Sequence, residues 1–140
     1  MDGLQVYLDS SVVLRWLLEA PGAIPDWGAW QHAVASELMQ VEVLRTLDRM
    51  RVRGEIRVSQ LAACVEELGI WVTALEEVPL NRIVLRRAAA PFSMPIATLD
   101  AIHLATALLW VERRGKPLTF LTHDGQLALA ARASGLEVRT

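Results

Sequence analysis

The alternation of apolar and polar positions along the chain predicts short strands separated by longer helices. Runs rich in β-branched and aromatic residues and bounded by turn or capping residues are typical of strands. The expected strands or extended segments are residues 4–9, 33–36, 77–80, 118–122 and 136–139. Among them, residues 118–122 (LTFLT) have the composition of a buried strand, and residues 4–9 (LQVYLD) end on an aspartate.

Helical periodicity fills most of the sequence between these strands. Apolar residues recur at steps of three and four, and glycines follow several of the runs as expected terminators. The expected helices are residues 10–19, 36–53, 59–75, 81–90, 99–114 and 124–134. The residues expected to cap them are Ser10 or Ser11, Ser59, Asn81 and Thr98. Residues 24–32, which carry Trp27 and Trp30, fit no pattern well, and a short helix is one interpretation.

Strands that alternate with helices favour an α/β fold with a mainly parallel central sheet. The chain contains no internal repeat, low-complexity tract or linker. We therefore expect residues 1–140 to form a single domain.

The composition indicates a globular protein and gives no sign of a basic surface for nucleic acid. A hydrophobic share of 53% with 21% charged residues indicates a globular chain, rather apolar for its length. Either a dense core or an apolar surface that a partner covers would account for this. The net charge of −2 gives no basic footprint, so any binding of nucleic acid must come from local geometry or from a bound cation.

Cysteine use and hydropathy suggest the compartment. Cys64 is the one cysteine, which suits a core position in a reducing compartment. No run approaches the about 18–20 apolar residues of a membrane span, and the N-terminus lacks the pattern of a signal peptide. We expect a cytoplasmic protein that does not contact a membrane.

Two aspartates follow predicted strands. Asp9 closes the strand at residues 4–9, and Asp124 lies just beyond the strand at residues 118–122. In open parallel sheets the functional crevice lies at the carboxyl ends of the strands. Both carboxylates are therefore expected at the same edge of the sheet.

Two further acids stand in apolar helices. Asp100 opens the helix at residues 99–114, where it either compensates the helix dipole or is held at the sheet edge. Glu42 lies beside an apolar stripe, which is costly unless it pairs with Arg45 or binds a metal. Glu37, one turn earlier, is an alternative to Glu42.

Several acids that converge at one edge repel each other and require a cation. Hard divalent ions such as Mg2+ and Mn2+ accept all-oxygen ligands of this kind. Such an ion would also neutralise a phosphate at a scissile bond, which partly answers the absence of a basic surface.

At these residues the chain resembles PIN-domain proteins, and specifically the VapC toxins of type II toxin–antitoxin modules. The matching pieces are YLDSSVV from residue 7, EVLRTL from residue 42, LDAIHLATA from residue 99, and LTHD from residue 121 with LALAA and GL after it. Their order and spacing cover essentially the whole chain, and LDAIHLATA is the most specific piece. A single Asp-Ser-Ser would be weak evidence.

This resemblance implies a three-layer α/β/α sandwich and an endoribonuclease that uses Mg2+ or Mn2+ to activate water. It implies that the metal-binding and catalytic acids are Asp9, Glu42, Asp100 and Asp124. It also implies structured RNA such as tRNA or rRNA as substrate, a VapB-type antitoxin that covers the active groove, and a homodimer.

Other side chains near these acids have minor predicted roles. Ser11 and Thr122 could orient carboxylates. Arg15 is either a contact to RNA phosphate or antitoxin, or a solvated charge. His103 is expected to be a buried packing residue and His123 a surface residue of a loop. The five tryptophans fit core or interface positions better than platforms for base stacking.

Two other functions compete with the nuclease. An aspartyl-nucleophile phosphohydrolase would use Asp9, but such enzymes want a second aspartate where this chain has Ser11. A catalytically silent PIN-like binding module is the other alternative, although degeneration would not preserve all four acids.

Overall fold

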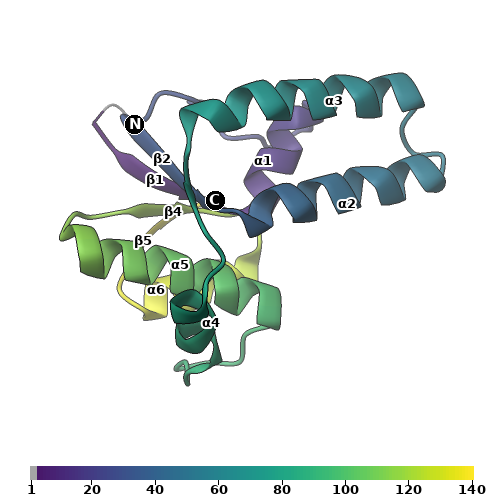
Figure 1. Ribbon diagram of the computed structural model, residues 1–140. Coiled ribbons are helices and arrows are strands. Elements are labelled where there is room, and N and C mark those ends of the chain that lie inside the picture. Colours follow the sequence, from purple (N-terminus) through teal and green to yellow (C-terminus); the bar gives the residue numbers. More distant parts are fainter. Residues whose placement is uncertain (1–2) are drawn as a thin grey trace.

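Five parallel strands form one sheet at the centre of the computed structural model, which describes residues 3–140 (Figure 1). The strands are β1 (Gln5–Leu8), β2 (His32–Ser36), β3 (Glu76–Val78), β4 (Thr119–Leu121) and β5 (Glu137–Arg139). Their order across the sheet is β3-β2-β1-β4-β5. In the register of the sheet, Val6 of β1 faces Ala33 of β2 on one side and Thr119 of β4 on the other. The predicted parallel sheet is confirmed.

Six α-helices and one 3-10 turn connect the strands within the described residues. The helices are α1 (Ser10–Leu17), α2 (Leu38–Val52), α3 (Val58–Trp71), α4 (Arg82–Ala89), α5 (Thr98–Arg114) and α6 (Gly125–Ala133), with the 3-10 turn at Val72–Ala74. None of the described helices is long and apolar enough to cross a membrane.

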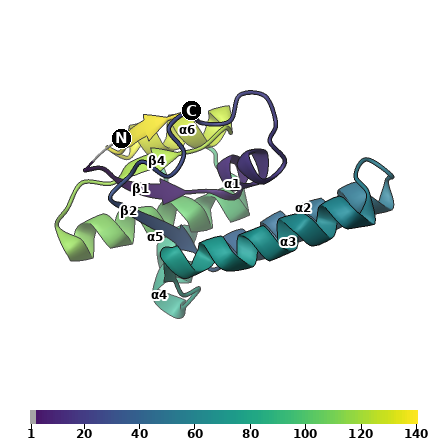
Figure 2. The same ribbon diagram turned by 90° about the horizontal axis from the view of Figure 1, so that it is seen from above.

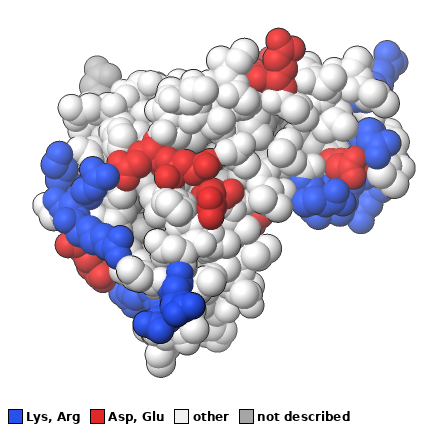
Figure 3. Space-filling view, in the orientation of Figure 1, with Lys and Arg blue, Asp and Glu red and all other residues white. Residues whose placement is uncertain are grey.

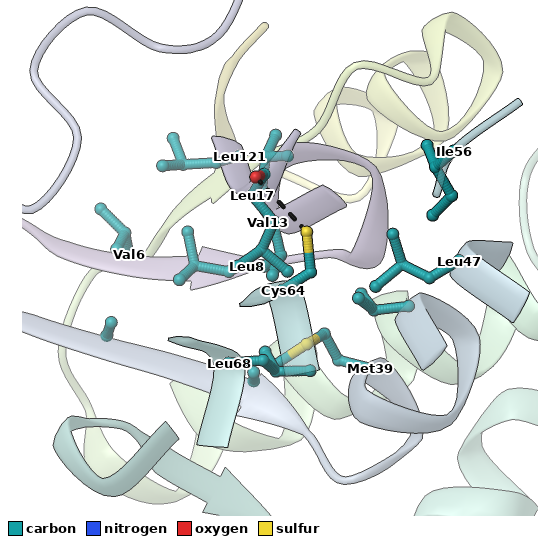
Figure 4. Close-up of a cluster of buried hydrophobic side chains, with 14 residues drawn as sticks. Val6, Leu8, Val13, Leu17, Met39, Leu47, Ile56, Cys64, Leu68 and Leu121 are labelled. Atoms are coloured by element: carbon teal, nitrogen blue, oxygen red, sulfur yellow. Dashed lines mark hydrogen bonds between the residues drawn. The ribbon is translucent and has the colours of Figure 1, made fainter. Parts of the chain in front are cut away.

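One face of the sheet packs against α1, α2 and α3. Val6 and Leu8 of β1 point to this side, because successive side chains of a strand face opposite ways. They meet apolar side chains from all three helices, including Leu17, Met39 and Leu68 (Figure 4). Cys64 lies in the same cluster, buried as expected.

The opposite face packs against α5 and α6. Tyr7, between Val6 and Leu8 in sequence, points to this side together with Val34 and Phe120. The helices contribute Leu104 and Leu127 among others. Helices on both faces of a parallel sheet give the three-layer α/β/α sandwich that the sequence predicted.

The antiparallel pair formed by α2 and α3 extends well beyond the sheet (Figure 2). Near its base, Trp27 stacks on Trp16 at 5.0 Å between ring centroids and also contacts Trp30 and Trp71. These four rings are partly buried against the first core cluster, in line with their predicted packing role.

Several local expectations were wrong. In the range 24–32, residues 24–31 form turns and bends with no helix, and residue 32 already belongs to β2. Asp9, not Ser10 or Ser11, caps α1, and α3 begins after Arg57 rather than at a Ser59 cap.

Two other predicted caps had different outcomes. Thr98 is the first residue of α5 and makes no capping hydrogen bond, while Asn81 caps α4 as predicted, at 3.0 Å to the Val84 amide.

Candidate active site

Asp9 lies where β1 ends, beside the end of the neighbouring strand β4. Its amide donates to the Leu121 carbonyl at 3.3 Å, which holds the two strand ends together. Its Oδ1 accepts hydrogen bonds from the Ser11 amide at 3.0 Å, the Ser11 hydroxyl at 2.6 Å and the Val12 amide at 3.2 Å. Its Oδ2 accepts from the Thr122 hydroxyl at 2.5 Å. The two residues predicted to orient a carboxylate are thus both bonded to Asp9.

The Asp9 carboxylate is almost fully removed from water, with 3% of the residue exposed. Burial raises the pKa of this carboxyl, against the lowering effect of the Ser11 and Thr122 hydrogen bonds. Within the described residues, no lysine or arginine forms an ion pair with it. A buried carboxylate held by neutral donors alone favours a cation as its further partner.

Asp124 lies at the same edge of the sheet, three residues after β4 ends. Its amide donates to the Thr122 hydroxyl at 3.0 Å, so one threonine contacts both aspartates. Its Oδ1 caps α6 through the amides of Gln126 and Leu127, at 2.9 and 3.0 Å. The predicted convergence of Asp9 and Asp124 follows from the pairing of β1 with β4.

Asp100 stands in the first turn of α5 and is half-buried. Burial is the main cause that raises the pKa of its carboxyl, and the negative charges of Asp124, Asp9 and Glu42 raise it further, against a lowering effect of His103. The repulsion shows that the four acids share one electrostatic environment. Dipole compensation accounts for the helix position of Asp100 but not for its proximity to the other three.

Glu42 does not pair with Arg45, which was one expectation. Its Oε1 is hydrogen bonded to Nε2 of His103, while Arg45 forms an ion pair with Asp48 at 3.2 Å. The alternative acid, Glu37, instead accepts a hydrogen bond from the Leu80 amide at 2.5 Å. Of the two glutamates, Glu42 is the one whose charge raises the pKa of Asp100.

His103 is buried as predicted, with 1% exposed, but it is more than a packing residue. Besides Glu42, its ring contacts the Tyr7 hydroxyl, which lies 2.7 Å from Nδ1. No pattern in the sequence connects these three residues. The one available clue was a histidine one turn after Asp100 on a helix whose other inward positions, apart from Thr106, are apolar.

The donor chemistry of the four acids fits a hard divalent cation. Oδ2 of Asp9 accepts one hydrogen bond, which leaves a lone pair, and the second oxygens of Glu42 and Asp124 accept none from the described residues. All would-be ligands are oxygens, which Mg2+ and Mn2+ prefer. In residues 3–140, however, no three aspartate, glutamate, histidine or cysteine side chains already converge on one point.

A groove of about 340 Å³ runs from Glu42 along the outer face of α2. It is lined by Leu38, Val41, Arg45 and Arg49 of α2, and by Leu99 of α5. Basic side chains gather over the outer part of α2 in Figure 3. The groove thus joins the acidic edge of the sheet to a cationic surface, although the net charge of the chain is negative.

Arg15 and Asp9 both act electrostatically on His123. Burial of the His123 ring is the main cause that lowers its pKa, and the positive charge of Arg15, half-buried on α1, lowers it further. His123 was expected at the surface. It is half-buried instead, and its Nε2 is buried without a hydrogen-bond partner among the described residues.

Comparison with known proteins gives one family match. The model of the PIN domain matches residues 6–132, a span that includes all four acids. A search of curated proteins finds no match to this chain.

Proposed function

Because this chain belongs to the PIN-domain family, we propose that it is an endoribonuclease that depends on Mg2+ or Mn2+ and acts as the toxin of a VapBC-type toxin–antitoxin module. PIN domains are typically nucleases, they bind nucleic acid, and they generally use divalent metal ions. The finer assignment to structured RNA, such as tRNA or rRNA, and to the toxin class rests on the motifs of this sequence.

The observation that carries the proposal is the gathering of Asp9, Glu42, Asp100 and Asp124 at the carboxyl edge of the sheet. Burial and, after it, the charges of the other acids raise the pKa of Asp100, and no lysine or arginine of residues 3–140 forms an ion pair with any of the four. A fold that keeps four acids together without a lysine or arginine partner supports a site for a cation.

Each residue of the site has a distinct task in this proposal. Asp9, Glu42, Asp100 and Asp124 would hold one or two divalent ions. A divalent ion bound there polarises phosphoryl oxygens and lowers the pKa of water. Ser11 and Thr122 keep the Asp9 carboxylate in one orientation through the bonds described above.

The geometry of Asp9 disfavours the phosphohydrolase alternative. An aspartyl nucleophile needs a carboxylate oxygen that can approach a phosphorus atom. Oδ1 of Asp9 already accepts three hydrogen bonds, Oδ2 accepts one, and the residue is 3% exposed. Asp9 is therefore better placed to hold an ion than to attack.

The proposed partners follow from the exposed apolar positions near the site. Val41 and Leu99, which line the groove beside Glu42, are 56% and 48% exposed. We propose that an antitoxin segment covers this groove in the inactive complex, and that the chain forms a homodimer. The proposed RNA substrates make the cytoplasm its place of action.

The first test is cleavage of RNA by the purified, antitoxin-free chain. We expect discrete fragments from total tRNA or rRNA with Mg2+ or Mn2+, and none with EDTA. Folded protein that binds Mn2+ but leaves every RNA intact would favour the silent binding module. A trapped phospho-aspartate at Asp9 would instead favour the phosphohydrolase.

The arginines of the groove give a second prediction. Replacing Arg45 and Arg49 by glutamine should raise KM for RNA several-fold and leave kcat nearly unchanged, because each lost phosphate contact weakens binding of substrate. The slope of log affinity against log salt should become shallower by roughly 0.7–0.9 per lost contact.

Arg113→Gln is the matched control for this double variant. Arg113 is exposed at the far end of α5 from Asp100 and does not line the groove. If all three proteins show the same KM and the same salt slope, RNA does not follow the groove along α2.

A further inference from the structure

Two buried side chains, linked by hydrogen bonds, hold Glu42 from within the molecule. His103 of α5 contacts its Oε1, and Tyr7 of β1 contacts the other side of the His103 ring. We propose that Tyr7 and His103 are positioning residues that fix which oxygen of Glu42 remains available at the acidic edge. This inference rests on the proposed function, in which Glu42 holds a metal ion.

The two contacts of the His103 ring favour one tautomer. An ionised carboxylate only accepts, so Nε2 of His103 must donate to Glu42. The Tyr7 hydroxyl lies 2.7 Å from Nδ1 of His103, and a phenol can donate to a bare ring nitrogen. A ring with its proton on Nε2 satisfies both contacts at once, and this is the tautomer that the proposal requires.

Packing restricts the orientations of the Tyr7 and His103 rings. Tyr7 is fully buried and stacks on Phe120, with ring centroids 4.9 Å apart and planes at 12°. His103 meets the Tyr7 ring edge-on, at 5.9 Å and 73°. With both rings fixed, Oε1 of Glu42 is committed to His103, and Oε2 is the oxygen left for another partner.

These hydrogen bonds also connect all three layers of the fold. Tyr7 belongs to the sheet, Glu42 to α2 on one face and His103 to α5 on the other. His103 stands one helical turn after Asp100, so the contact fixes α5, and with it Asp100, relative to Glu42.

A measurement without metal or activity tests the first step. Long-range 1H–15N spectra of the wild-type apoprotein should show His103 with its proton on Nε2. A proton on Nδ1 alone, with Nε2 bare, would overturn the inference, because Glu42 would then have no donor. No variant is needed, so folding of mutants does not affect this test.

Mn2+ affinity of the apoprotein, measured by calorimetry, tests the second step. In His103→Gln the amide nitrogen reaches the place of Nε2 and can still donate to Glu42. In His103→Asn the shorter side chain cannot. We expect Mn2+ to bind about 10-fold or more weakly to His103→Asn and within about threefold of wild type to His103→Gln.

Tyr7→Phe removes one hydroxyl and keeps the stack on Phe120. We expect a loss of Mn2+ affinity smaller than that of His103→Asn, together with a mixed His103 tautomer. Equal Mn2+ affinities across all these proteins would overturn the positioning role while leaving the metal site intact. A wild-type protein that binds no Mn2+ would overturn the proposed function itself, so the two failures are distinguishable.

Discussion

Replacing Asp100 by asparagine is expected to abolish metal-dependent cleavage of RNA, with a loss of at least about 100-fold. A divalent ion contributes several kcal/mol of charge stabilisation in phosphoryl transfer, and about 1.4 kcal/mol corresponds to a tenfold change in rate. Asparagine keeps the shape of the side chain but removes its charge. The rate of RNA cleavage at saturating Mg2+ is the measurement.

The same substitution should stabilise the metal-free protein. Because the pKa of Asp100 is raised in the folded state, the folded protein is stabilised where this group is protonated and loses that stability as the pH rises through the raised pKa. At neutral pH the ionised carboxylate therefore opposes folding, and Asp100→Asn should raise Tm. The gain should be a few degrees only, since Asp100 is half-buried and solvent screens its charge.

Glu112→Gln is the matched control, an acid-to-amide change at the opposite end of the same helix. Glu112 is 55% exposed and pairs with Arg87. We expect wild-type cleavage from this variant and no rise in Tm. Wild-type cleavage from Asp100→Asn would exclude Asp100 from the proposed metal site, and a Tm that falls in the apoprotein would contradict the repulsion among the acids.

The positions of Asp9 and Asp124 could be predicted because each depends on the end of the strand that precedes it in the sequence. Each acid follows a strand, and adjacent parallel strands bring their carboxyl ends to one edge of the sheet. The same holds for the alternation in β1, which sends Val6 and Leu8 to one face and Tyr7 to the other. Patterns of period two and of three to four are local, so the sequence alone reveals them.

The partners of Glu42 could not be predicted in this way. Arg45 is a neighbour by helix spacing, whereas His103 is 61 residues distant and belongs to the opposite layer. Only the closed sandwich brings them together. The prediction of the residue that caps α1 was wrong for a different reason. Asp9, Ser10 and Ser11 all have side chains that can cap a helix, and local propensity does not show which of them does so.

Phe120→Ala is expected to cause the largest loss of stability among single substitutions near the site. Phe120 is fully buried in the central part of the sheet, where it stacks on Tyr7. Truncation of a buried phenylalanine costs about 3–5 kcal/mol, a large part of the roughly 5–15 kcal/mol that typically holds a domain folded. Urea unfolding followed by circular dichroism measures this cost.

Ile70→Ala is the control, because Ile70 is 68% exposed and its truncation should change the free energy of unfolding by no more than about 0.5 kcal/mol. Similar urea midpoints for Phe120→Ala and wild type would show that the core around Tyr7 tolerates a cavity.

Phe120→Leu then separates packing from positioning. Leucine fills much of the lost volume, so this variant should fold, but it offers no ring to hold Tyr7 in place. If Tyr7 positions His103, and His103 positions Glu42, this variant should bind Mn2+ more weakly although its fold is intact. Unchanged Mn2+ affinity would mean that the Tyr7 hydroxyl finds His103 without the stack, and that the two hydrogen bonds alone fix the acid.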